Sequence, residues 1–77
     1  MIRSLVEEIV KSIVDNPSRV EIIESELPDG KHMIAIKIAE SDLGKVIGRN
    51  GQTIKAIRAV VYALNTHDKE IIVDIAS

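Results

Sequence analysis

Apolar residues recur at helical spacing at the start of the chain. The apolar positions there are Ile2, Leu5, Val6, Ile9, Val10, Ile13 and Val14, with charged residues between them. Because residues at i, i+3, i+4 and i+7 share one face of a helix, this spacing predicts an amphipathic helix with one buried stripe. A proline disfavours helical geometry at the residue before it, so we expect the helix to stop at Asp15, Asn16 and Pro17.

The next two segments predict a β-hairpin. Residues 20–27 are rich in isoleucine, valine and glutamate, and residues 28–30, with the sequence Pro-Asp-Gly, favour a turn. Residues 32–38 then alternate as a strand with one covered face requires. The covered face is expected to hold Ile34, Ile36 and Ile38, and the other face Met33, Ala35 and Lys37.

Two helices and a strand are predicted for the remainder. Residues 40–42 are of types that begin helices, and the short helix that follows is expected to end at Gly48. A second helix is predicted from Gly51 to the break at residues 65–68, followed by a strand over residues 70–75. The positions assigned to the core are Val46, Ile57, Val61 and Leu64 in the helices and Ile71, Val73 and Ile75 in the strand.

This order of elements predicts an α+β fold. The tight turn makes the first two strands antiparallel, whereas the two-helix crossover is long enough to make the second and third parallel. One face of the resulting three-stranded mixed sheet carries the isoleucine and valine rows, so all three helices are expected on that face. The chain is short enough that we expect one small domain over residues 1–77.

Composition excludes several classes of protein. With 45% hydrophobic and 29% charged residues, the chain can fold and is not a disordered tail. The longest apolar run, residues 59–64, is far below the ~20 residues of a membrane helix. Glu7, Glu8 and Lys11 interrupt any signal peptide, and the lack of cysteine excludes thiol chemistry and disulfides. A cytoplasmic location, with no membrane partner, is therefore expected.

The charges are unevenly distributed. The net charge is −2, yet residues 43–67 contain four basic residues and no acidic ones, while the rest of the chain contains six basic and twelve acidic residues. The four are Lys45, Arg49, Lys55 and Arg58. A local balance of +4 indicates an anionic ligand only where the backbone also provides anion-binding geometry.

Two glycines three positions apart supply such geometry. Gly48 ends one predicted helix and Gly51 begins the next, so the backbone can approach a ligand and the second helix offers free N–H groups. Phosphate is the expected ligand, and Arg49, Lys55 and Arg58 add charge beside it. The alternative is an ordinary helix-ending glycine followed by a turn.

Residues 46–54, with the sequence Val-Ile-Gly-Arg-Asn-Gly-Gln-Thr-Ile, resemble the Val-Ile-Gly-x-x-Gly-x-x-Ile signature of KH domains. The order helix, strand, strand, helix, helix, strand is that of the bacterial, type II KH fold. The resemblance covers the whole chain and is nearest to the KhpA-like family of small bacterial RNA-binding proteins. It implies that the GxxG loop clamps the backbone of about four nucleotides of single-stranded RNA, while bases lie in an apolar groove between two helices and a strand.

The resemblance also assigns residues to this interface. The clamp is expected at Gly48, Arg49, Asn50 and Gly51, the groove at Gly44, Lys45, Ile47 and Ile54, and further basic contacts at Lys55 and Arg58. Ile36 is a candidate for the strand wall of the groove. Tyr62 follows Arg58 by four residues, so it either stacks on a base or covers an edge of the core.

No catalytic activity, cofactor or metal is expected. His32 and His67 lack further ligands at metal-binding spacing, and no catalytic triad or Walker loop is present in the sequence. The resemblance implies a homodimer, or a heterodimer with a larger Jag-type KH protein. The alternative function is a protein interaction subunit whose RNA contact is secondary. A candidate dimer surface lies on the sheet face away from the helices, at Ile23, Met33, Ala35 and Ile72.

Overall fold

The computed structural model describes residues 2–65 and 70–76. The helices and strands are α1 (Ile2–Ile13), β1 (Glu21–Glu26), β2 (His32–Lys37), α2 (Leu43–Ile47), α3 (Gln52–Leu64) and β3 (Ile71–Ile75). Short 3-10 turns lie at Pro17–Arg19, Glu40–Asp42 and Arg49–Gly51. The predicted order of elements is confirmed, with boundaries that differ by a few residues. His67 and most of the predicted break after α3 lie outside the described residues.

The sheet has β2 at its centre. β1 pairs with β2 in antiparallel fashion, with Ile22 opposite Ile36, and β3 pairs with β2 in parallel, with Val73 opposite Ile34. Both predicted strand directions are therefore confirmed. Because side chains alternate along a strand, this register places these four side chains on one face of the sheet.

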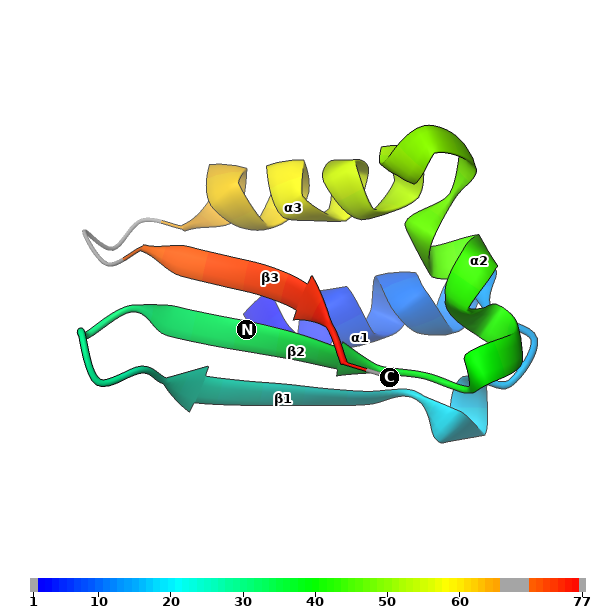
Figure 1. Cartoon of the computed structure of the whole chain (residues 1–77), viewed down its shortest axis with the longest axis horizontal. Coiled ribbons are helices and arrows are strands. Elements are labelled where there is room, and N and C mark those ends of the chain that lie inside the picture. Colours follow the sequence, from blue (N-terminus) through cyan, green and yellow to red (C-terminus); the bar gives the residue numbers. More distant parts are fainter. Residues whose placement is uncertain (1, 66–69, 77) are drawn as a thin grey trace.

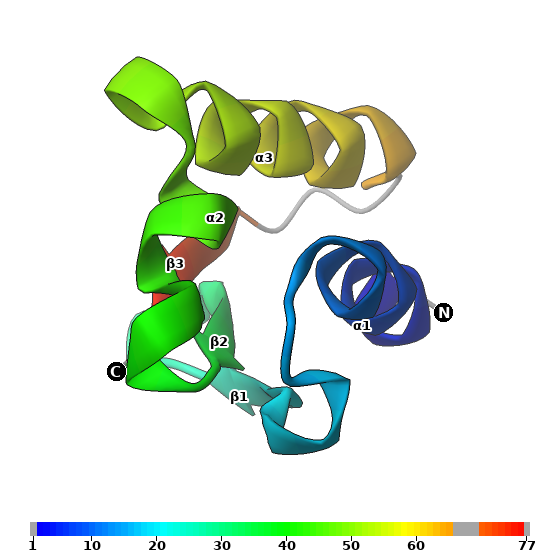
Figure 2. The ribbon, with the colours of Figure 1, turned by 90° about the vertical axis from the view of Figure 1, so that its right-hand side faces the viewer.

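The helices pack on that face. In Figures 1 and 2, α1 and α3 lie on the same side of the sheet, and α2 lies beyond the ends of β2 and β3. The buried cluster between the layers consists of Val6, Val10, Ile22, Ile34, Ile36, Val46, Ile54, Ile57, Val61 and Val73. All three helices contribute to it, so the α+β class predicted from the sequence is confirmed.

Two predicted positions are wrong. Leu64 was assigned to the core but is 43% exposed. The last α3 residue in the buried cluster is Val61, and the apolar repeat of the helix continues past it to a position that the core does not reach. Ile36 is fully buried under the helices, so it cannot form a wall of a binding groove. The strand that lies between β2 and α3 is β3 (Figure 1).

Candidate nucleic-acid interface

The turn between α2 and α3 requires glycine at position 48. Gly48 has φ +76° and ψ 173°, a backbone conformation that is essentially restricted to glycine. A Cβ atom at this position would lie 2.2 Å from Oγ1 and 2.7 Å from Cβ of Thr53. The Gly48 N–H donates to the carbonyl of Gly44 at 2.9 Å, which ends α2. Gly48 is thus a helix-ending glycine, but one that no other residue can replace without strain.

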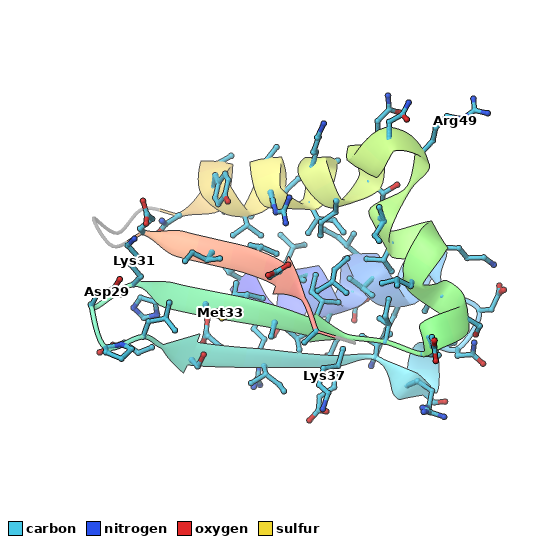
Figure 3. All side chains as sticks on the ribbon, in the orientation of Figure 1. Asp29, Lys31, Met33, Lys37 and Arg49 are labelled. Atoms are coloured by element: carbon cyan, nitrogen blue, oxygen red, sulfur yellow. The ribbon has the colours of Figure 1, made fainter. Side chains whose placement is uncertain are left out.

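The rest of the turn lies on the surface. Asn50 (φ 55°) and Gly51 (φ 74°) are both left-handed, a conformation that asparagine and glycine adopt more readily than other residues. Arg49 and Asn50 are exposed, and Figure 3 shows the Arg49 side chain directed away from the protein. If Gly51 carried a Cβ atom, the nearest neighbouring atom would be Cε of Lys55, at 3.9 Å. A ligand therefore has open access to the backbone of this turn.

Two of the four basic residues have partners elsewhere in the fold. The Lys45 ammonium forms a hydrogen-bonded ion pair with Asp15, which lies outside the acid-free segment. This hydrogen bond raises the pKa of Lys45, against a smaller opposing effect of desolvation. The Arg58 Nε–H donates to the carbonyl of Val73 at 3.0 Å, and its Nη2 lies 4.0 Å from Asp74.

The other two basic residues differ in having no partner within the described part of the chain. Among residues 2–65 and 70–76, Arg49 and Lys55 have no ion-pair partner. Both side chains are exposed, and both lie beside the turn at Gly48–Gly51. The positive field predicted from the linear sequence is therefore concentrated at this turn, because distant acidic residues fold against the other two cations.

A buried carboxylate fixes the start of α2. Asp42 is 1% exposed and accepts hydrogen bonds from the backbone N–H groups of Asp15 and Asn16, both at 3.1 Å, and from Asn16 Nδ2 at 3.0 Å. Burial alone would raise the pKa of Asp42, but these hydrogen bonds outweigh it and lower the pKa. The sequence predicted residues 40–42 together as the acidic and capping residues of this helix start. The Asp42 carboxylate makes no capping hydrogen bond and instead ties the end of α1 to α2.

The predicted groove residues are unequally accessible. Gly44 is exposed, and a Cβ there would meet no atom within 4 Å, so α2 is open to a ligand at this point. Ile47, one position before the turn, is 36% exposed. Ile54 is only 6% exposed and belongs to the core cluster, so it can offer a ligand no more than a small edge. RNA contact by these residues remains a prediction.

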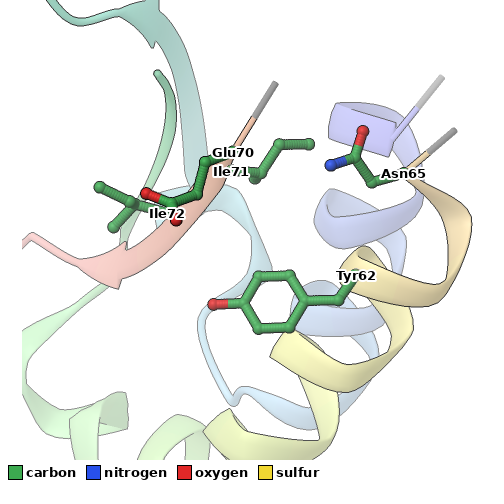
Figure 4. A pocket seen from close by; sticks show the side chains of 5 residues that line it. All are labelled: Tyr62, Asn65, Glu70, Ile71 and Ile72. Carbon is green, nitrogen blue, oxygen red and sulfur yellow. The ribbon is translucent and has the colours of Figure 1, made fainter. Parts of the chain in front are cut away.

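A hollow that sequence analysis largely missed lies between α3 and β3. It measures about 450 Å³ and is lined by Tyr62 and Asn65 from the end of α3 and by Glu70, Ile71 and Ile72 at the start of β3 (Figure 4). From the sequence, Tyr62 was singled out as a base contact or a cover of the core edge, Ile71 as a core residue and Ile72 as part of the candidate dimer surface. Nothing in the sequence placed them together, because they meet only through the parallel pairing of β3 with β2.

The sequence was then compared with known proteins. A family model described as KhpA/KhpB, KH domain, matches residues 3–75. The chain belongs to this family. RNA-binding protein KhpA of Oceanobacillus iheyensis is 43% identical over 74 residues, which cover 95% of this chain and 97% of the relative. RNA-binding protein KhpA of Streptomyces coelicolor is 44% identical over 64 residues, or 83% of this chain and 80% of the relative.

A more distant relative keeps the same length. RNA-binding protein KhpA of Thermotoga maritima is 36% identical over 73 residues, which cover 95% of this chain and 96% of the relative. No solved structure matches with significance. Membership in the KhpA/KhpB family confirms the type II KH fold that the sequence predicted, and this is a KH-domain family rather than an enzyme family.

In residues 2–65 and 70–76, no three histidine, aspartate or glutamate side chains are grouped so that they would hold a metal ion. The helices of this part of the chain are all too short or too polar to cross a membrane.

Proposed function

We propose that this chain binds single-stranded RNA, with the turn at Gly48–Gly51 as the clamp on the sugar-phosphate backbone. The observation that carries this proposal is the exposed turn itself. Its backbone at Gly48 is one that essentially only glycine adopts, and Arg49 and Lys55 beside it have no ion-pair partner among the described residues. The family supports it, because its relatives are named RNA-binding proteins.

The proposed mechanism uses the start of α3. This helix has thirteen residues, so its first turn presents N–H groups and the positive end of its dipole to a phosphate. Arg49 and Lys55 add charge-assisted contacts at the same place. Bases then lie over the open surface of α2 at Gly44 and beside the exposed Ile47, which together offer apolar contact without recognition of a particular base.

A paired charge reversal tests the clamp. The double variant Arg49→Asp, Asn50→Asp places two carboxylates where phosphates are proposed to bind, so RNA binding is expected to be lost by repulsion. Ser18→Asp, Arg19→Asp is the matched control, because it makes the same change in charge in another exposed turn. Filter binding with single-stranded RNA measures affinity, and circular dichroism checks the fold. Equal affinity of the two double variants would refute the clamp.

A second candidate function is protein association, and exposed apolar side chains on α3 favour it. Val60 and Leu64 are 39% and 43% exposed and lie four residues apart, so they form an apolar strip on one side of the helix. The proposed partners are a second copy of the chain or a larger Jag-type KH protein. Two linked KH domains would bind long RNA more tightly by making the second contact intramolecular.

Sedimentation of single variants separates this surface from the one predicted on the sheet. Val60→Asp is expected to weaken association if the strip on α3 is the interface. Ile23→Asp, on the open sheet face, is the matched control, since Ile23 is 40% exposed. A strictly monomeric wild-type chain, alone and with a Jag-type partner, would exclude this function.

A further inference from the structure

The sheet has an open edge along β1. The strand order is β1-β2-β3, so β1 has a neighbour on one side only, and it forms the lower border of the sheet in Figure 1. Six consecutive pairs join it to β2, from Glu21 opposite Lys37 to Glu26 opposite His32, so the strand has no bulge. It also has no proline. Since edge strands are commonly protected by bulges, proline or charge, β1 has only its charged side chains for this purpose.

The hydrogen bonds of the hairpin identify the backbone groups at this edge. The Leu27 N–H donates to the Lys31 carbonyl at 2.7 Å, so these two positions form a hydrogen-bonded pair. Such pairs alternate along an antiparallel ladder, and residues 21, 23 and 25 therefore direct their backbone groups to β2. The N–H and C=O groups of Ile22 and Glu24 point to the open edge, and no residue in the described part of the chain bonds to them.

The side chains along this edge are acidic. Glu21 and Glu24 are exposed and have no ion-pair partner among residues 2–65 and 70–76. The carboxylate of Glu26 lies 4.0 Å from Nε2 of His32. β1 itself contains no basic residue, and Lys37 lies opposite Glu21 on β2. Unpaired backbone groups and negative charge therefore occur together at this edge.

The charge decides which strand the edge accepts. A second copy that paired through its own β1 would bring the three glutamates of each strand together, and like charges across a ladder are destabilising. Lysine or arginine opposite Glu21 and Glu24 would instead form an attractive pair at each position. Ile23, which is 40% exposed, offers apolar contact on the open face of the sheet. The edge is thus suited to an extended segment that combines basic and apolar residues.

We propose that the outer edge of β1 binds an extended basic segment of another protein, which joins the sheet as a fourth, antiparallel strand. Backbone hydrogen bonds with Ile22 and Glu24 would hold the segment, and the glutamates would select its charge, as in other cases of strand addition. The opposite edge of the sheet is β3, which adjoins α3 through the bond from Arg58 to Val73. A segment on β1 would therefore leave the proposed clamp open, and its binding does not require RNA.

A six-residue peptide tests the edge. The probe is acetyl-Lys-Thr-Lys-Ile-Val-Lys-amide, which in antiparallel register places its lysines opposite the three glutamates of β1 and its isoleucine opposite Ile23. Titrated into the isotope-labelled chain, it is expected to move the amide NMR signals of Ile22 and Glu24 and to leave those of Gly48 and Gly51 in place. A peptide with glutamate in place of each lysine is expected not to bind.

Two N-methylated peptides separate strand addition from charge attraction alone. Methylation at the third and fifth peptide residues removes the N–H groups that would donate to Glu24 and Ile22. Methylation at the second and fourth residues removes N–H groups that would point away from the chain, and it leaves the charge the same. The first peptide is expected to lose about 5- to 100-fold in affinity, the effect of two backbone hydrogen bonds. The second is expected to bind as the unmodified peptide does.

Charge reversal on the chain supplies matched variants. Glu21→Lys, Glu24→Lys is expected to lose binding of the lysine peptide and to gain binding of the glutamate peptide. Glu8→Lys, Glu40→Lys makes the same change in charge at exposed positions outside the sheet, so it should bind the lysine peptide as wild type does. Edge strands tolerate lysine, so the first variant should fold, as circular dichroism would verify.

Distinct results would overturn the proposal. If wild type does not bind the lysine peptide, or binds the two methylated peptides equally well, the glutamates only protect an edge that no added strand joins. If the amide signals of Ile22 and Glu24 move with protein concentration instead, and sedimentation shows that Glu24→Lys strengthens association, the edge pairs with a second copy of the chain.

Discussion

At the scale of single residues, two glycines of the same short segment have opposite structural roles. Gly48 holds a positive φ against Thr53 and has no room for a side chain. Gly44 is the second residue of α2, where a Cβ would meet no atom within 4 Å. The fold therefore requires glycine at position 48, whereas it would accept a residue with a side chain at position 44.

Alanine substitutions should separate these roles. Gly48→Ala is expected to destabilise the chain by about 1–3 kcal/mol, the cost of a side chain in a sparsely populated backbone region. Gly44→Ala is expected to stabilise it by up to about 1 kcal/mol, because alanine favours a helix, yet to weaken RNA binding by filling the proposed groove. Urea denaturation and filter binding measure the two effects. An unaltered RNA affinity of Gly44→Ala would remove this face of α2 from the interface.

The ion pair of Lys45 with Asp15 gives a second prediction at this scale. Asp15 occupies the ammonium that a phosphate would otherwise contact, so Asp15→Asn should raise affinity for RNA. Because the pair is exposed, the gain should be only a few-fold. The slope of log affinity against log salt should also steepen by about 0.7, the value of one added phosphate contact on a single strand. Glu24→Gln, which removes the same charge from an exposed position on β1, is the control and should change neither quantity.

At the scale of elements, α2 is too short to be stable by itself. It has five residues, and isolated helices shorter than about 12 residues are marginal in water. Both of its ends are fixed from outside, by the hydrogen bonds of Asp42 to residues 15 and 16 and by the packing of Gly48 on Thr53. The position of the proposed groove therefore depends on contacts with α1 and α3.

The Asp42 carboxylate predicts a dependence of stability on pH. Its pKa in the folded chain lies below the ordinary value of 3.8, so its contribution is complete above that value and is lost as the pH falls through the lower folded value. Asp42→Asn should lower the free energy of unfolding at pH 7. Below about pH 4, the free energies of unfolding of the variant and of wild type should lie closer together. Urea denaturation across this range provides the comparison. A difference that stays constant with pH would show that Asp42 acts by shape and not by charge.

The limits of sequence analysis also appear at this scale. Periodicity identified each helix and strand and, in α1, β2, α3 and β3, the face that is buried, because both properties are local. It failed where a distant residue decides the outcome: Lys45 and Asp15 are thirty positions apart, and Asp42 bonds across 26 and 27 positions. For the same reason the spacing in α3 did not show that the core ends at Val61 and leaves Leu64 exposed. The turn at Gly48–Gly51 was predictable, since its glycines and their spacing are its cause.

At the scale of the whole molecule, an acidic chain carries a small and localised positive field. The net charge is −2, and the structure pairs two of the four basic residues of the acid-free segment with carboxylates from other elements. Among the described residues, Arg49 and Lys55 keep no carboxylate partner, and they are the two cations that we propose contact phosphates. The chain should therefore bind RNA weakly through each site, with little long-range attraction.

Salt dependence measures how many contacts operate. Two phosphate contacts predict a slope of about −1.4 in a plot of log affinity against log salt, and release of Lys45 and Arg58 by RNA would bring it toward about −3. Filter binding with single-stranded RNA over a range of salt concentrations yields the slope. A value steeper than about −5 would demonstrate a larger basic surface than the fold presents.

The position of β2 between its two neighbours also determines which contacts are hardest to form. Its pairing with β1 closes only the short turn at residues 27–31, whereas its pairing with β3 spans residues 38–70, including both helices of the proposed interface. Loop closure costs more entropy as the loop lengthens. The hairpin is therefore the part of the sheet that assembles most readily, and β3 completes it at the greatest entropic cost. The hollow beside Tyr62 has β3 as one wall, so loosening of this strand would open the hollow while the hairpin persists.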